Sequence, residues 1–192
     1  MYIAGGQLGS WNAVRIIRNM FPLLVILSII VLWAGITLEQ AEEMLRTYAI
    51  LAIIVPTMID MGGNLGAILS SRLTSRFHLG TSVLDPRDHV LWANVGAIFA
   101  LALTIFTALA VGAYTIGLVL GMPIGFLDLL AISLISGMTV AAIAVVFSFA
   151  ATYGSFRLGI DPDDTTIPIV TNVVDVFGMI VFIAVSAWIL GF

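Results

Sequence analysis

The last apolar run of this chain contains the segment PIVTNVVDVFGMI at residues 168–180, with Asp175 near its centre. A transmembrane helix needs about 20 consecutive, mostly apolar residues, and this run is long enough. A carboxylate at membrane depth is costly unless it faces protein or water, so acids in such segments usually serve ions or protons. The segment therefore predicts a membrane span that carries a functional acid.

The composition of the whole chain also indicates a membrane protein. Of the 192 residues, 61% are hydrophobic and only 9% are charged, whereas soluble domains average about 25% charged residues. The chain has no cysteine, which excludes disulfides, thiolate metal sites and cysteine nucleophiles. The net charge is −4 and there is no basic patch, so no nucleic-acid partner is expected.

Apolar runs predict an all-α membrane protein with five spans, inserted in the cell membrane and surrounded by lipid. The expected spans cover residues 20–38, a second run from about residue 47, and residues 90–120, 124–156 and 168–188. We expect residues 20–192 to form one transporter domain. Residues 1–19 mix apolar and basic side chains at helical spacing, which predicts a short amphipathic segment at the lipid headgroups.

The arginines predict how the spans are oriented. Six of the seven lie in the N-terminal segment, the link at residues 70–89 and the link at residues 157–166. Five spans place these three segments on the same side of the membrane, and arginine-rich loops are usually cytoplasmic. We therefore expect a cytoplasmic N-terminus and an extracytoplasmic C-terminus.

The second span carries its own polar motif, PTMIDMGGNLG at residues 56–66. Pro56 removes a helical hydrogen bond and the glycines weaken the helix, so we expect a kink or local unwinding. Asp60 and Asn64 are four residues apart and point the same way if the helix continues. Gly63 and its neighbours predict either free carbonyls at an ion site or a tight helix crossing.

The last span presents a similar combination of polar and small residues. Thr171, Asp175 and Gly178 share one face of a helix, and Asn172 lies beside it. Oxygen ligands without sulfur or histidine suit hard cations such as Mg²⁺ or Ca²⁺. The alternative is a hydrogen-bonded Asp175 that only holds two helices together.

Three further groups of polar residues have simpler interpretations. The two histidines lack the spacing of a zinc site and indicate a solvated loop. The glutamates between the first two spans indicate a hydrated loop, or residues that gather cations at the outer mouth. The aspartates before the last span are expected to cap its helix, or to form a cytoplasmic cation site at Asp161. These residues are His78 and His89, then Glu39, Glu42 and Glu43, then Asp161, Asp163 and Asp164.

At these motifs the sequence resembles the MgtE magnesium channels and the related solute-carrier family of eukaryotic magnesium transporters (family forty-one). Residues 56–66 resemble the second-span signature, a proline followed by Gly-Gly-Asn, and the continuation LSSRLT at residues 69–74 resembles the solute-carrier version. Asp161-Pro162, then Pro168 and Asp175, keep the order and spacing of the last helix. Asp60 is an acid that the bacterial motif lacks.

The resemblance implies a pore between two five-helix halves, and hence a parallel homodimer, because one chain supplies one half. It also implies that Asp175 of both subunits binds a largely hydrated Mg²⁺, with Asn64 lining the same pathway. We expect Mg²⁺ as the transported ion, no organic cofactor, no enzyme activity, and no nucleotide-binding regulatory domain in this chain.

We therefore predict a homodimeric Mg²⁺ transporter or channel. The predicted metal-binding residues are Asp175, Asp60 and Asn64, and the predicted pore-lining residues are Thr171, Asn172, Gly63 and Gly178. A Na⁺- or H⁺-coupled Mg²⁺ exchanger of the same architecture is the alternative. A membrane enzyme that acts on lipid is a third possibility, but the acids and histidines form no recognised catalytic motif.

Overall fold

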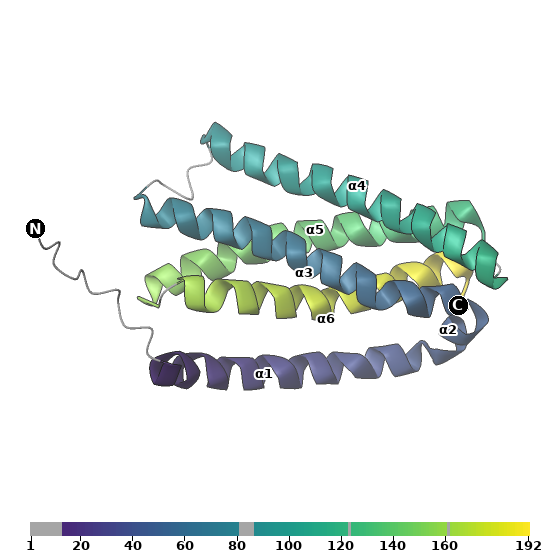
Figure 1. Ribbon diagram of the computed structural model, residues 1–192, viewed down its shortest axis with the longest axis horizontal. Coiled ribbons are helices and arrows are strands. Elements are labelled where there is room, and N and C mark those ends of the chain that lie inside the picture. Colours follow the sequence, from purple (N-terminus) through teal and green to yellow (C-terminus); the bar gives the residue numbers. More distant parts are fainter. Residues whose placement is uncertain (1–12, 81–86, 123, 161) are drawn as a thin grey trace, which may run out of the picture.

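The computed structural model describes residues 13–80, 87–122, 124–160 and 162–192, and of residues 13–16, 19 and 162–164 it describes the backbone alone. The described chain is helical almost throughout (Figure 1). The helices are α1 (Ala13–Gln40), α2 (Glu42–Thr47), α3 (Ala49–His78), α4 (His89–Leu120), α5 (Phe126–Arg157) and α6 (Pro162–Leu190).

Within the described residues, five helices are long and apolar enough to cross a membrane, which confirms the predicted fold class. They run alternately in opposite directions, so α1 begins at one end of the bundle and the C-terminus lies at the other (Figure 1). Residues 1–12 of the predicted amphipathic segment lie outside the described part, and residues 13–19 continue directly into α1. The interfacial position of residues 1–19 stays a prediction.

Besides the start of α1, two helix boundaries differ from those expected. The helix α3 continues through the polar residues after Ser70 as far as His78, and α6 begins at Pro162 rather than near Pro168. Proline is well tolerated at the first position of a helix, where its missing N–H has no intrahelical partner. A helix can continue past the apolar zone because its polar turns lie at the headgroups or in water, where hydropathy no longer reports on it.

Pro56 does not interrupt α3, which is helical over its whole length. The proline lacks an N–H for the carbonyl of Ala52, four residues earlier, and only this one hydrogen bond is lost. The local unwinding expected at the glycines is therefore absent, and a kink at Pro56 stays a prediction. Continuity matters for the site, because it preserves the helical offsets between Asp60, Gly63 and Asn64.

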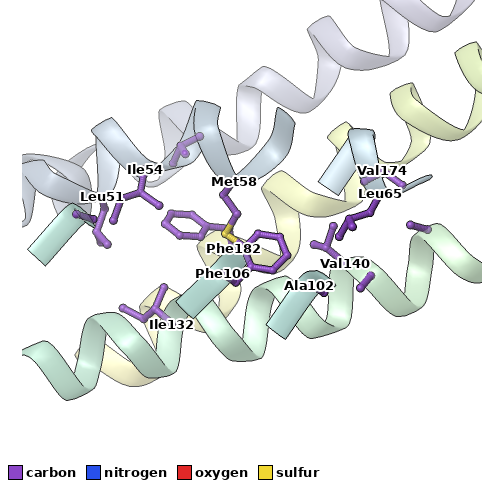
Figure 2. Packing of buried hydrophobic residues seen from close by; sticks show 14 of the residues in the cluster. Leu51, Ile54, Met58, Leu65, Ala102, Phe106, Ile132, Val140, Val174 and Phe182 are labelled. Atoms are coloured by element: carbon purple, nitrogen blue, oxygen red, sulfur yellow. The ribbon is translucent and has the colours of Figure 1, made fainter. Parts of the chain in front are cut away.

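The core of the bundle lies among α3, α4, α5 and α6. The helices α3, α5 and α6 pack against one another, α4 covers α3 and α5, and α1 packs mainly along α6 (Figure 1). Figure 2 shows the buried side chains of this cluster, which includes Met58 of α3, Phe106 of α4 and Phe182 of α6.

Small residues allow α3 to approach its neighbours closely. A side chain at Gly62 would place its Cβ 2.5 Å from Cγ1 of Val140 on α5 and 3.1 Å from Cγ1 of Val174 on α6. A Cβ at Gly66 would lie 2.6 Å from Cγ1 of Val170. Because lipid is as apolar as the helices, membrane helices associate largely through such close packing.

At the end of the bundle where α3 finishes, an ion pair closes the connection to α4. Arg76 donates a hydrogen bond to Oδ2 of Asp88, whose Oδ1 accepts one from the N–H of Val90 at 2.8 Å and so caps α4. These contacts, the Arg76 hydrogen bond foremost, hold the pKa of the Asp88 carboxyl below its ordinary value of 3.8.

Replacing Gly62 by alanine should destabilise the protein, because the added methyl meets Val140, whose branched side chain has few alternative rotamers. We expect the free energy of unfolding to fall by about 1–3 kcal/mol, the usual cost of overpacking a core. The measurement is the midpoint of unfolding in detergent, which should be lower in the variant. Gly154→Ala is the matched control, because no atom lies within 4 Å of the added Cβ. Equal midpoints for the two variants would contradict the packing argument.

The Asp88 carboxyl should make stability dependent on pH in acid. Because its pKa is lowered in the folded protein, the unfolded chain takes up the proton first, and stability falls as the pH drops below about 4. Asp88→Asn keeps a helix cap but removes the charge. Between about pH 6 and about pH 3, the unfolding midpoint of this variant should therefore fall less than that of the natural protein.

Glu42→Gln is the control for this experiment. Glu42 pairs with Arg46 at 2.6 Å across one turn of α2, and both side chains are largely exposed. Exposed pairs contribute little to stability. An acid sensitivity that Asp88→Asn leaves unchanged would show that the ion pair with Arg76 does not stabilise the α3–α4 connection.

Candidate cation-binding site

A groove with a volume of about 340 Å³ lies between α3 and α6. It is lined by residues from the middle of α3 and by two residues of α6 that are one helical turn apart. The lining residues are Pro56, Ile59, Asp60, Gly63, Asn64, Thr171 and Asp175. The structure thus brings together five of the residues predicted to bind metal or to line a pore.

At the groove, α3 lies close to α6 at Gly63. A Cβ at this position would lie 3.2 Å from Oδ1 of Asp175 and 3.8 Å from Cβ of Thr171. Any larger residue would crowd the carboxylate. Gly63 therefore lets half-buried Asp175 lie directly against the backbone of α3, on the groove side.

The neutral polar side chains of the groove each donate a hydrogen bond to a neighbouring group. The hydroxyl of Thr171 donates to the carbonyls of Ile167 and Pro168, at 3.0 and 3.2 Å. The amide nitrogen of Asn64 donates to Oδ2 of Asp60 at 3.1 Å. Both side chains keep oxygen lone pairs that can accept further bonds, and Asn64 also keeps its second amide hydrogen.

The charges of the groove are negative. Among the described residues that line it, the two ionisable ones are acids, Asp60 and Asp175, and none is a lysine, arginine or histidine. An arrangement of carboxylates and oxygen acceptors attracts a cation and repels an anion. Oxygen ligands of this kind suit Mg²⁺ and other hard divalent ions.

Two predicted pore-lining residues lie outside this groove. Asn172 donates its side-chain amide to the carbonyl of Pro168 at 2.8 Å. Gly178 is buried against α5, where an added Cβ would lie 3.6 Å from Cγ2 of Val140. A pore-lining role for these two residues stays a prediction.

The other predicted positions are also separate from the groove. Asp161 lies outside the described residues. His78 and His89 are exposed, as are the glutamates at the opposite end of the bundle. Within the described residues, no group of three or more histidines or acids is placed to hold a metal ion.

Two buried serines behind the groove form a chain of hydrogen bonds that the sequence did not predict. Ser148 of α5 donates to the carbonyl of Gly66 at 3.2 Å and accepts from Ser70 at 3.1 Å. Ser70, Ser148 and Gly66 are all buried, so these hydrogen bonds connect α5 to α3 close to Gly63. Serines are common in membrane helices, and only the packing of the two helices shows that these two meet.

The five membrane-spanning helices and the acid-lined groove define a multi-pass membrane protein with the features of a cation transporter. Comparison with known families agrees: the model of the MgtE family, described as a divalent cation transporter, matches residues 55–185, which include the whole groove. The chain belongs to the MgtE family, and its function is divalent cation transport across a membrane. No solved structure matches the chain.

Water should reach the groove, because its lining includes the exposed residues Asp60 and Asn64. The chain has no cysteine, so a single cysteine at Ile59, in the groove, reports access without background. We expect it to react quickly with a hydrophilic thiol reagent, because the reactive thiolate forms only where water is present. Cysteines at buried Ser148 and at Leu103, on the exposed surface of α4, should react slowly. Similar rates at the three positions would exclude a hydrated groove.

Proposed function

We propose that the chain transports Mg²⁺ through a pore on the two-fold axis of a homodimer. In this proposal, Asp175 of each subunit contributes one carboxylate to a hydrated ion. The observation that carries the proposal is the groove between α3 and α6, where two acids and two hydrogen-bond acceptors converge and none of the described lining residues is basic.

The exposure of Asp60 and Asn64 supports a second subunit. Both side chains are exposed on a single chain, yet they lie within a helix that spans the membrane. A carboxylate in contact with lipid tails is strongly unfavourable, so the surface around them must face water or protein. A symmetric partner that presents the same surface satisfies this requirement and encloses a hydrated space.

The chemistry of Mg²⁺ supports two copies of the site. The ion requires octahedral coordination and gives up water reluctantly, so proteins usually bind it through one or two carboxylates and several retained waters. Two Asp175 side chains would balance the charge of one dication. Asp60 and Asn64 would bind the ion or its waters, and Gly63 and Thr171 would line the path.

We also propose that the N-terminal side of the bundle is cytoplasmic. Arg18 at the start of α1, Arg72 and Arg76 at the end of α3, and Arg157 at the end of α5 lie at one end of the antiparallel bundle (Figure 1). The other end carries Arg46 beside several glutamates. This asymmetry matches the positive-inside rule.

A Na⁺- or H⁺-coupled exchanger is the second candidate. It is favoured by Asp60, which adds a second acid to the groove and gives a coupling ion a place to bind. Imposed Na⁺ and pH gradients separate the two mechanisms, because a channel responds only to the gradient of Mg²⁺ itself and to the membrane potential.

Replacing Asp175 by alanine should abolish Mg²⁺ uptake into proteoliposomes. Losing one member of a desolvated charge interaction costs about 2–5 kcal/mol, so we expect the flux to fall by a factor of about 30 or more. Asp128→Asn is the matched control, because this exposed acid lies in the first turn of α5, away from the groove. Unchanged flux in Asp175→Ala would sink the proposed site.

A further inference from the structure

We propose that Asp60 is a positioning residue, which holds the side-chain amide of Asn64 with its oxygen available to the transported cation. This inference rests on the proposed function, since it concerns how the same groove presents its ligands. It assigns the acid a role through Asn64, in addition to the charge that it brings to the groove.

The hydrogen bond between the two side chains allows one orientation of the amide. Nδ2 of Asn64 lies 3.1 Å from Oδ2 of Asp60. Turning the amide over would place its oxygen against the carboxylate oxygen at this distance, and two acceptors would face each other with no hydrogen between them. An ionised Asp60 therefore selects the orientation in which the amino group is occupied and Oδ1 is free.

Nothing else in the described part of the chain fixes this amide. Asn64 is exposed, and its hydrogen bond to Asp60 is the only one that it makes there. Without Asp60, the amide could present its amino group to the groove as readily as its oxygen. An amino group carries partial positive charge and repels a cation, so the orientation decides whether Asn64 attracts or repels Mg²⁺.

The same device occurs on the opposite wall of the groove. The hydroxyl hydrogen of Thr171 is held by the carbonyls of Ile167 and Pro168, so the oxygen presents lone pairs. In metal sites, outer partners of this kind orient the ligands, and losing them typically lowers metal affinity or activity about 10–100-fold. Asp60 and these carbonyls play equivalent parts on α3 and α6.

The continuity of α3 is needed for this contact between Asp60 and Asn64. Asp60 and Asn64 meet because residues four apart lie on one face of an α-helix. Unwinding at the intervening Gly62 and Gly63 would separate them. The helix is continuous there, so a single chain holds the amide in place before any partner or ion binds.

The test measures what Asn64→Ala does to the apparent Mg²⁺ affinity of proteoliposome flux in three backgrounds. These are the natural Asp60, Asp60→Asn and Asp60→Ala. Both substitutions at position 60 remove the charge. Alanine also removes the hydrogen bond, whereas asparagine can either accept it from Asn64 or donate to Oδ1 of Asn64, so it no longer selects one orientation. All variants are compared as folded, reconstituted protein, and both side chains are exposed, so folding should be unaffected.

If Asp60 positions the amide, Asn64→Ala should cost roughly 10-fold in affinity with Asp60, less with asparagine, and little with alanine. The same loss in all three backgrounds would overturn the inference and leave Asp60 acting by charge alone. Failure of the proposed function is recognised separately, because Asp175→Ala would then retain its affinity for Mg²⁺ in the same assay.

A spectroscopic measurement reports the orientation without relying on flux. In protein labelled with ¹⁵N-asparagine, the side-chain NH₂ signals of Asn64 are identified by their loss in Asn64→Ala. We expect one of the two hydrogens to exchange slowly with water in the natural protein and faster in Asp60→Ala, where no carboxylate accepts its hydrogen bond. Equal exchange in the two proteins would contradict the inference.

Discussion

The close approach of α3 and α6 at Gly63 is the constraint on which the candidate site depends. Asp175 lies so near the Cα of this glycine that an added Cβ would be 3.2 Å from its carboxylate oxygen. A carboxylate inside a membrane must be kept away from lipid, and this contact covers one side of it with backbone. Gly62 and Gly66, on the neighbouring face of α3, allow the same helix to pack against α5 and α6. Small residues of α3 therefore allow both the close packing of the helices and the space that Asp175 occupies.

Most of the fold could be predicted from the sequence, because length and hydropathy determine which segments cross a membrane. The five spans are confirmed. The end of α3 and the beginning of α6 were predicted wrongly, because both helices extend beyond the apolar zone into polar turns. Hydropathy measures contact with lipid, and a helix can continue where that contact stops.

The site could be predicted only in part, for a physical reason that concerns helix contacts. Asp60, Asn64 and Asp175 are conspicuous because polar residues are rare at membrane depth, and helical offsets add Thr171. Gly178 aligns with Thr171 on an ideal helix, yet two turns along α6 its neighbour is Val140 of α5 rather than α3. Which helix covers which turn depends on packing between distant segments, and no periodicity within one segment contains that information.

In the proposed function, the preference of the groove for cations depends on its hydrogen bonds as well as on its charges. Threonine and asparagine can each donate or accept a hydrogen bond, so their presence in a pore does not by itself select the sign of an ion. On α6 the helix backbone takes up the hydroxyl hydrogen of Thr171. On α3 the carboxylate of Asp60 takes up an amide hydrogen of Asn64. Both interactions lie within a single helix, so they exist before the ion arrives and need no rearrangement when it does. Groups organised in advance bind more effectively than groups that must first reorient, and here regular helical geometry supplies that organisation.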